Sequence, residues 1–312
     1  MPSRVLVTGG AGFIGLNLVA HLAERGYSVT ILDIAPRPPL PRGITYRQGD
    51  IRDPRAVGQA MAEVDAVVHL AAATRVIDSI DDPGTNFDVN VRGTLVVLDA
   101  ARTAGIRQVI AASTGGAILG EAPVPVTEAM APAPMAPYGA SKLAMEGYLS
   151  AYAGAYGLHA AALRFSNIYG PGSRHKGSVI AKLFNALLAD KTFTLYGDGS
   201  QVRDYLYVGD LVAGIRQAME VGVTGTYQLG SGVPTRLSEL LKDVHYITGY
   251  QEIPLAYAPF RAGEVHTTYC SITKAVNAFG FAPTTSLRDG LAATWAWFCN
   301  NAGMFRRSKA AG

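Results

Sequence analysis

Tyr138 and Lys142 lie four residues apart in the segment Pro137–Lys142 (PYGASK), with nothing larger than a serine between them. Residues at positions i and i+4 of a helix project from the same face, so the phenol and the ammonium can share one site. A cation about 4 Å away, at an effective dielectric constant of about 20, stabilises a phenolate by about 4 kcal/mol, or about three pKa units. The pair therefore predicts a tyrosine base that takes a proton from a hydroxyl group near neutral pH.

An isolated pair of this kind could also be an exposed contact on a helix surface. Other residues must therefore show whether the pair is catalytic. Thr114, with Ser113 beside it, ends a β-rich run in the segment Ala111–Gly116 (AASTGG). Its hydroxyl could hold the reacting oxygen, although a strand that simply ends in a Ser/Thr turn would look the same. Taken with the glycine-rich loop at the start of the chain, these residues predict one catalytic site.

That loop is Thr8–Gly15 (TGGAGFIG), which follows the first β-rich run and opens a helix-patterned stretch. Glycines at its turn let a pyrophosphate approach backbone N–H groups at the positive end of the helix. Asp33 ends the second β-rich run, 18 residues after Gly15, where a carboxylate accepts ribose hydroxyls. A carboxylate repels a 2′-phosphate, so we expect NAD rather than NADP, with Arg37 leaving NADP open.

Two further strand ends point to the same cleft, because ligands of open α/β sheets bind at the carboxyl ends of the strands. The segment 49–51 (GDI) could cover the adenine, and the segment 69–72 (HLAA) has small residues on which a cofactor could lie flat. The cofactor-binding residues expected from these segments are Gly9, Gly12, Phe13, Ile14, Gly15, Asp33, Asp50, Ile51, Leu70, Ala71 and Ala72.

Short β-rich runs alternate with longer helix-patterned stretches through the first half of the chain. The expected strands are Val5–Thr8, Val29–Asp33, Ile44–Gln48, Ala66–Leu70, Gln108–Ser113 and Ala160–Phe165. The expected helices are Phe13–Arg25, Pro54–Ala62, Pro83–Ala104 and Tyr138–Tyr156. Such alternation indicates a parallel sheet covered on both faces. The predicted fold is α/β, a doubly wound parallel sheet (Rossmann) with a smaller C-terminal substrate-binding lobe.

The predicted Rossmann domain spans residues 1–167 and regains about 204–230, since helix-patterned Val208–Glu220 and strand-like Thr226–Leu229 can return to it. Residues 168–203 and 231–312, where Gly/Pro-rich turns separate shorter elements, form the predicted second lobe.

Composition narrows the class of protein. The chain of 312 residues is 49% hydrophobic and 16% charged, and its net charge of +3 is not gathered into Lys/Arg blocks, so we expect no nucleic-acid partner. No hydrophobic signal core or membrane-length apolar stretch is found, and no metal-ligand spacing. Two cysteines, Cys270 and Cys299, fit a reducing cytoplasm.

The motifs TGGAGFIG, Asp33, HLAA, ASTGGA and YGASK, with LRFSNIYGPG and YGDGSQVRDYLYVGD further on, resemble the extended short-chain dehydrogenase/reductase family, in its nucleotide-sugar epimerase/dehydratase branch. The resemblance covers essentially the whole chain and is closest to the UDP-glucose 4-epimerases. It implies bound NAD, a nucleoside-diphosphate-sugar substrate, and a homodimer formed by the helical stretches Asn86–Ala104 and Tyr138–Tyr156.

The same resemblance implies roles for single residues. Thr114, Tyr138 and Lys142 would be catalytic, and Asn90 and Phe165 would lie by the nicotinamide. Ser113, Tyr138 and Lys142 would also bind the cofactor. The residues implied to hold the nucleoside diphosphate are Asn167, Val179, Tyr196, Arg203, Arg261 and Glu264.

Gly115 and Gly116 stand where dehydratases of this branch carry acids, so we expect epimerisation at C4 of a UDP-hexose of the glucose/galactose type. A UDP-glucuronate or UDP-N-acetylhexosamine 4-epimerase is the alternative. The loop Gly172–Lys176 (GSRHK) has cationic groups that could pair with a C6 carboxylate. An NADPH-dependent reductase fits less well with Asp33, and an idle NAD-binding interaction protein is the alternative from another class.

Overall fold

The structure is a computed structural model that describes residues 2–250, 252–260 and 265–302. Its centre is a parallel sheet of seven strands in the order β3-β2-β1-β4-β5-β6-β10. The strands are β1 (Arg4–Thr8), β2 (Ser28–Asp33), β3 (Thr45–Gln48), β4 (Ala66–His69), β5 (Gln108–Thr114), β6 (His159–Phe165) and β10 (Gly225–Leu229). The predicted α/β fold with a Rossmann-type sheet is confirmed.

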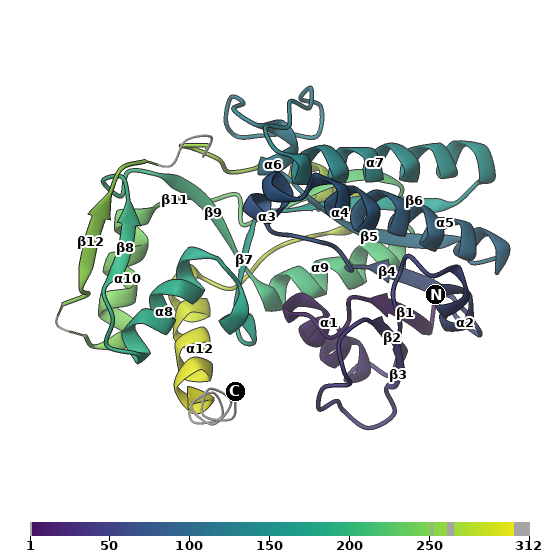
Figure 1. Ribbon diagram of the computed structural model, residues 1–312, viewed down its shortest axis with the longest axis horizontal. Helices are drawn as coiled ribbons and strands as arrows, with labels where there is room; N and C mark the ends of the chain where they lie inside the picture. The colour runs from purple at the N-terminus through teal and green to yellow at the C-terminus, as the bar shows by residue number, and fades with distance from the viewer. Residues whose placement is uncertain (1, 251, 261–264, 303–312) are drawn as a thin grey trace.

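Helices cover both faces of this sheet because both faces of the strands are apolar (Figure 1). On one face pack α1 (Phe13–Ala23), α9 (Val208–Val221) and α11 (Thr273–Phe279). On the other face pack α2 (Pro54–Ala60), α5 (Gly93–Thr103) and α7 (Pro137–Tyr156). The carboxyl ends of β1, β4 and β5 carry Thr8, His69 and Thr114. Thr8 pairs with His69, and His69 pairs with Ala111, so Thr114 extends three residues further at the same end of the sheet.

The stretch predicted as one helix, Pro83–Ala104, is three elements in the structure: α4 (Pro83–Phe87), a π-helical turn η1 (Asp88–Arg92) and α5. Asn90, which lies in the π-helical turn, bonds through its side chain to Ala73 and Ser141. An additional short helix, α3 (Val76–Asp81), precedes α4, and Asp82 caps α4 by accepting the N–H of Thr85 at 2.9 Å. The spacing of apolar residues does not reveal this π-helical turn. The turn coincides with hydrogen bonds from the Asn90 side chain to residues far away in the sequence.

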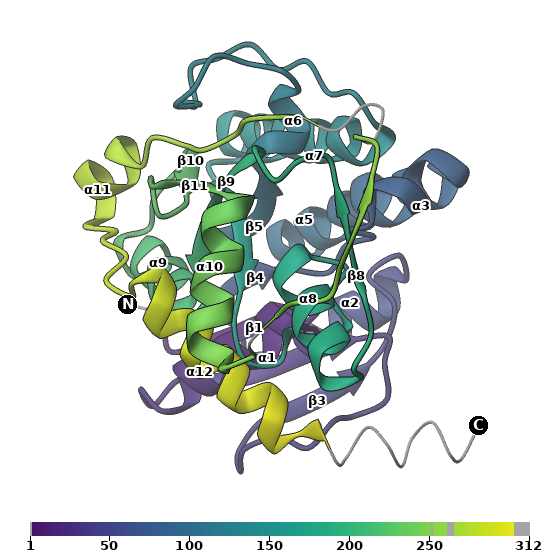
Figure 2. The same cartoon turned by 90° about the vertical axis from the view of Figure 1, so that its left-hand side faces the viewer.

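A second set of elements lies beside the sheet. Strands β7 (Asn167–Tyr169), β9 (Val202–Tyr207) and β11 (Pro234–Arg236) form one small sheet, and β8 (Phe193–Tyr196) pairs with β12 (Leu255–Ala258). Helices α8 (Val179–Leu188), α10 (Leu237–Thr248) and α12 (Leu287–Asn300) share a separate core built around Phe184 and Phe298 (Figure 2). The domain boundaries given from the sequence remain a prediction.

A buried carboxylate joins three parts of this second set. Asp204 of β9 accepts hydrogen bonds from the backbone and hydroxyl of Ser231, at 2.7 and 2.8 Å, and from the N–H of Gly232 at 3.1 Å. The N–H of Cys270 donates to the same carboxylate at 3.4 Å. Asp204 therefore ties the strand that carries Arg203 to two later segments of the chain.

Within the described ranges, no helix has the length and apolar character needed to cross a bilayer.

Candidate active site

The glycine-rich loop leaves no space for a Cβ atom at Gly9 or Gly15. Gly9 has φ of +69°, and a Cβ there would lie 2.6 Å from the nitrogen of Ala71. A Cβ at Gly15 would lie 2.4 Å from the carbonyl oxygen of Gly9. The loop therefore packs closely on the end of β4 and on itself, while Gly12, directly before α1, is exposed. This cradle fits the pyrophosphate of a dinucleotide.

Asp33, at the end of β2, is fixed against this loop. Its Oδ2 accepts the N–H of Ala11 and its Oδ1 the N–H of Ala35, each at 2.9 Å. Arg37, the residue that left NADP open, donates to the carbonyl oxygen of Ile44 at 3.5 Å. A carboxylate with this orientation beside the loop favours an adenosine ribose without a 2′-phosphate.

Asp50 and Ile51, from the segment expected to cover the adenine, differ in burial: Asp50 is partly exposed and Ile51 lies in the core. The Asp50 carboxylate pairs with Arg52 at 2.6 Å, and that partner lowers the pKa of Asp50. Ile51 is buried and packs where a Cβ on Gly93 would meet it at 2.6 Å. Ile51 thus also belongs to the core under α5.

The end of β4 is held by hydrogen bonds from neighbouring elements. The N–H of Ala71 donates to the Thr8 hydroxyl at 3.3 Å, and Leu70 N–H donates to the Thr8 carbonyl at 3.1 Å. Asn90 accepts the N–H of Ala73 at 2.8 Å and donates to Ser141 of α7 at 3.0 Å. Leu70, Ala71, Ala72 and Asn90 consequently lie between the glycine-rich loop and α7.

The three expected catalytic residues are brought together where β5 ends and α7 begins. The hydroxyl of Thr114 is hydrogen-bonded to the phenol of Tyr138. Lys142 is buried one helical turn further along α7. Its Nζ donates to the carbonyl oxygen of Ala112 at 2.7 Å and lies 3.9 Å from Met145 Sδ.

The charge states of this pair differ from the expectation drawn from spacing. Burial raises the pKa of Tyr138 to about 12, against the opposite effect of the Thr114 hydrogen bond. Burial also lowers the pKa of Lys142 to about 8, against the opposite effect of Glu146. Low polarity disfavours both charged forms, and the Lys142 ammonium is directed to the Ala112 carbonyl. Lys142 therefore does not lower the pKa of Tyr138 here, although the spacing of the two residues predicted that it would.

A cavity of about 430 Å³ lies among β7, β8, β9 and the start of α8. Four of the residues implied to hold the nucleoside diphosphate line it: Asn167, Val179, Tyr196 and Arg203. Its size is that of a small-molecule site. Phe165 lies next to this region, paired with Thr114 across β5 and β6. Arg261 and Glu264 lie outside the described residues.

Some lining residues were missed by the sequence reasoning. Val76 of α3 reaches the cavity from the Rossmann side, and Gln201 lines it close to Arg203. Gln201 is buried and its Nε2 bonds the carbonyl oxygen of Tyr196. Strand alternation gives the missed signal, since Gln201 directly precedes β9, lies two residues before Arg203 and lines the same cavity.

The loop Gly172–Lys176 does not direct all its cations to one place. Lys176 donates to the carbonyl oxygen of Ile168 at 2.6 Å and lies 5.5 Å from the centre of the Phe13 ring. It therefore faces the glycine-rich loop. Arg174 is half-buried in the 3₁₀ turn η2 (Ser173–His175), and its carbonyl accepts from Asn185 at 2.9 Å.

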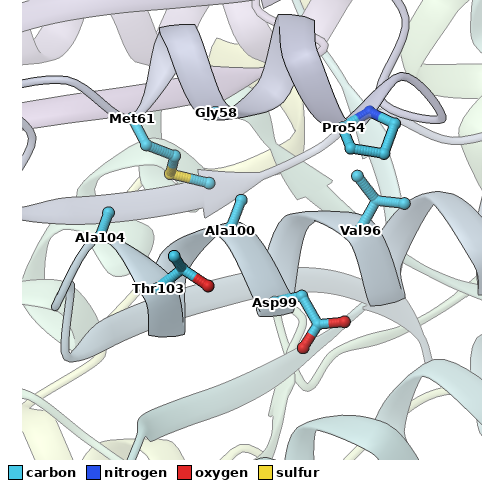
Figure 3. Close-up of a pocket in the computed structure, with 8 residues that line it drawn as sticks. All are labelled: Pro54, Gly58, Met61, Val96, Asp99, Ala100, Thr103 and Ala104. Atoms are coloured by element: carbon cyan, nitrogen blue, oxygen red, sulfur yellow. The ribbon is translucent and has the colours of Figure 1, made fainter.

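A second cavity, of about 390 Å³, lies between α2 and α5. Figure 3 shows small and apolar side chains such as Ala100, Val96 and Met61 along it. It contains none of the residues predicted for the site. In the part of the chain that is described, no cluster of three or more His, Cys, Asp or Glu side chains could hold a metal ion.

Comparison with known proteins finds both epimerases and dehydratases of one family among the similar proteins. Residues 5–230 match the NAD dependent epimerase/dehydratase family. A UDP-glucose 4-epimerase of Mycolicibacterium smegmatis is 35% identical, over 95% of this chain and 99% of that protein.

Solved structures agree. The Thermotoga maritima UDP-glucose 4-epimerase with UDP-glucose has a TM-score of 0.91 and 36% identity, over 96% of this chain and 99% of that one. The Thermus thermophilus UDP-glucose 4-epimerase in complex with NAD has a TM-score of 0.88 and 37% identity, over 95% and 99%.

Proposed function

This chain belongs to the NAD dependent epimerase/dehydratase family, and from that premise we propose that it is an NAD-dependent 4-epimerase of a UDP-hexose of the glucose/galactose type. The observation that supports the proposal most is that Thr114, at the end of β5, lies beside Tyr138 and one turn from Lys142 of α7, at the same end of the parallel sheet as the glycine-rich loop. In this proposal the sugar extends to Tyr138 from the cavity lined by Arg203, where its nucleotide is held. NAD, when bound, supplies a reversible hydride acceptor.

Each proposed catalytic side chain has a separate task. Tyr138 takes the proton of the sugar C4 hydroxyl and returns it at the end of the cycle. Thr114 holds the same oxygen by a hydrogen bond. Lys142 supplies a nearby positive charge when protonated. Because the C4 hydride leaves and returns inside the site, turnover consumes no external reductant, and inversion requires the 4-keto sugar to present its other face.

Dehydration is less compatible with this site. Gly115 has no side chain, and a Cβ there would lie 2.7 Å from Oε1 of the buried Gln228. An acid at position 115 would therefore require the amide end of the Gln228 side chain to move. Elimination of water needs a proton donor for the departing hydroxyl. The two glycines therefore support epimerisation.

Arginine at position 203 suits a diphosphate because its planar fork binds phosphate oxygens bidentately. Its Nη1 already donates to the carbonyl oxygens of Val202 and His266, each at 2.9 Å. These contacts hold the guanidinium at the cavity. Asn167, Val179 and Tyr196, with Arg261 and Glu264, complete the proposed nucleotide site.

The test is a comparison of kcat/KM for UDP-glucose, UDP-galactose, UDP-N-acetylglucosamine and UDP-glucuronate, with analysis of the C4 epimers formed. We expect the two hexoses to be converted best. The uronate alternative rests on Arg174, since Lys176 is directed to Ile168 and Phe13. A preference above tenfold for the uronate, lost in Arg174→Ala, would replace the hexose assignment. No turnover of any UDP-sugar, with no NAD bound, would favour the idle interaction protein.

We further propose a cytoplasmic homodimer with two-fold symmetry. Tyr148 and Tyr156 of α7 are 40% and 55% exposed, and Phe87 of α4 is 56% exposed. An interface made of these helices would cover such side chains. The two free thiols, Cys270 and Cys299, suit a reducing compartment. Light scattering at micromolar concentration is expected to give twice the chain mass, and a monomer there would contradict the dimer.

A further inference from the structure

A buried ion pair lies directly behind the proposed catalytic residues. Glu146 is on α7, and the side chains of Glu146 and Arg164 are only 8% and 4% exposed. Arg164 of β6 donates through Nε to Glu146 Oε1 at 2.9 Å and through Nη2 to Oε2 at 2.7 Å. The Ser113 hydroxyl donates to Oε1 at 2.6 Å. Three elements, α7, β5 and β6, therefore meet at one carboxylate.

This carboxylate is connected to each catalytic residue by short steps. Tyr138, Lys142 and Glu146 follow one another at intervals of four residues along one face of α7. Ser113, which bonds Glu146, directly precedes Thr114. The carbonyl that receives the Lys142 ammonium belongs to Ala112, on the other side of Ser113.

Stability alone explains the pair poorly. Replacement of a buried ion pair by well-packed uncharged side chains is often neutral or stabilising, because removal of two charges from water costs as much as their attraction returns. Arg164 also leaves its Nη1 buried without a hydrogen-bond partner within the described residues. Stability therefore does not account for the buried Glu146 carboxylate.

Its charged and titratable surroundings point to Lys142. From β4, His69 faces the lysine, and burial holds the pKa of His69 at about 3, so this ring is neutral. From α7, Tyr138 is neutral as well, since its pKa is raised. Arg164 from β6 adds a positive charge, which the Glu146 carboxylate neutralises. Among the described residues, Glu146 supplies the negative charge that opposes the effect of burial on Lys142.

We propose that Glu146 is a positioning residue of the reaction: fixed by Arg164 and Ser113, its carboxylate keeps the Lys142 ammonium charged at working pH and holds the end of β5 that carries Thr114. The inference rests on the proposed function for its catalytic meaning, since the charge of Lys142 affects turnover only where Tyr138 acts as a base.

The first measurement is the pH profile of kcat with UDP-galactose and added NAD, for the wild type, Glu146→Gln and Ser113→Ala. Glu146→Gln keeps the shape of the side chain and removes its charge, so Lys142 loses its proton more easily. We expect the alkaline limb of kcat to move to lower pH by about one unit. Ser113→Ala removes a hydrogen bond and keeps the charge, so kcat falls while the limb stays in place.

Glu146→Gln leaves Arg164 charged and buried, which can prevent folding. The double variant Glu146→Gln/Arg164→Met replaces the pair by uncharged side chains and is expected to move the limb in the same direction by a smaller amount. If the single or double variant folds and the limb does not move, the proposal is wrong. A loss of melting temperature with an unchanged limb would mean that the pair only staples α7 to the sheet.

A second measurement does not depend on any sugar. In protein labelled with ¹³Cε-lysine, the resonance of Lys142 is assigned by its loss in Lys142→Met and followed through a pH titration. The midpoint is expected to fall in Glu146→Gln and to stay in Ser113→Ala. A fallen midpoint in an enzyme that converts no UDP-sugar would keep the role of Glu146 and reject the proposed function. An unchanged midpoint in an active enzyme would reject the role of Glu146 alone.

Discussion

The Asp33 carboxylate accepts the backbone N–H of Ala11 at 2.9 Å, so the end of β2 is tied to the glycine-rich loop at the end of β1. This bond fixes a negative charge where an adenosine ribose would lie beside the loop. We expect this one side chain to favour NAD⁺ over NADP⁺.

We therefore predict that NAD⁺ raises the melting temperature of the purified protein and that NADP⁺ does not. Asp33→Ser should weaken NAD⁺ binding by about tenfold or more, since hydrogen bonds to charged groups contribute about 1.5–3 kcal/mol. The gap between NAD⁺ and NADP⁺ should narrow at the same time, because the repulsive charge is gone. Calorimetric titration of both cofactors measures this, and an unchanged preference in Asp33→Ser would contradict it.

Tyr138→Phe should lower kcat by about 100-fold to 10,000-fold, the usual contribution of a positioned acid–base group. The phenyl ring keeps the shape of the side chain and removes only the ionisable oxygen. Circular dichroism and NAD⁺ affinity should match those of the wild type. A variant that kept a tenth of the wild-type rate with an intact fold would remove Tyr138 from the role of base.

Lys142→Met should stabilise the protein at pH 7 while it abolishes turnover. Burial lowers the pKa of Lys142 from 10.5 to about 8. Below pH 8 the lysine is charged in both states, and its charge is less favourable in the folded state than in the unfolded state. At pH 7 this difference lowers the free energy of unfolding by about 3 kcal/mol. Loss of the hydrogen bond to Ala112 offsets about 1 kcal/mol of the gain.

The sign of the pH dependence gives the control for that experiment. The wild type should gain stability as pH rises from about 8 to 10.5, where the folded lysine is neutral and the unfolded lysine still binds a proton. The advantage of Lys142→Met in urea denaturation should shrink over that window. A variant that is less stable than the wild type at pH 7 would show that the ammonium is not penalised by burial.

Gly15→Ala should destabilise the fold by about 1–3 kcal/mol and impair NAD⁺ binding, because overpacking forces the backbone to move. The new Cβ would lie 2.4 Å from the carbonyl oxygen of Gly9. Gly58→Ala in α2 is the matched change in open space, with nothing within 4 Å of its Cβ, and should stabilise by about 1 kcal/mol. Urea denaturation of both variants checks the pair, and similar effects of the two changes would contradict the cradle.

The sequence is most informative where function depends on local spacing. The glycine loop, Asp33 and the Tyr138–Lys142 pair are readable because one turn of backbone or helix places them. The direction of the Lys142 ammonium is not readable, since it depends on burial and on the carbonyl of Ala112, which lies on another element. The hydrogen bonds that join Ser113, Glu146 and Arg164 could not be predicted from the sequence for the same reason.

The substrate side is less predictable. Residues of the cavity such as Val76 and Gln201 come from elements more than a hundred positions apart in the chain. The resemblance found some of their neighbours, and neither apolar spacing nor composition could have done so. The π-helical turn at Asp88–Arg92 could not be predicted from the sequence, because its side chains contact other elements.

The bonds that converge on Asp204 have a consequence for how the protein is made. Its donors come from residues 231, 232 and 270, so this carboxylate cannot be fully paired until most of the chain has left the ribosome. The first six strands of the large sheet are synthesised before residue 166 and can assemble earlier, as N-terminal domains generally do. A nascent chain arrested before residue 231 would therefore hold six strands of the cofactor half beside a strand β9 whose Asp204 carboxylate still lacks all of these donors.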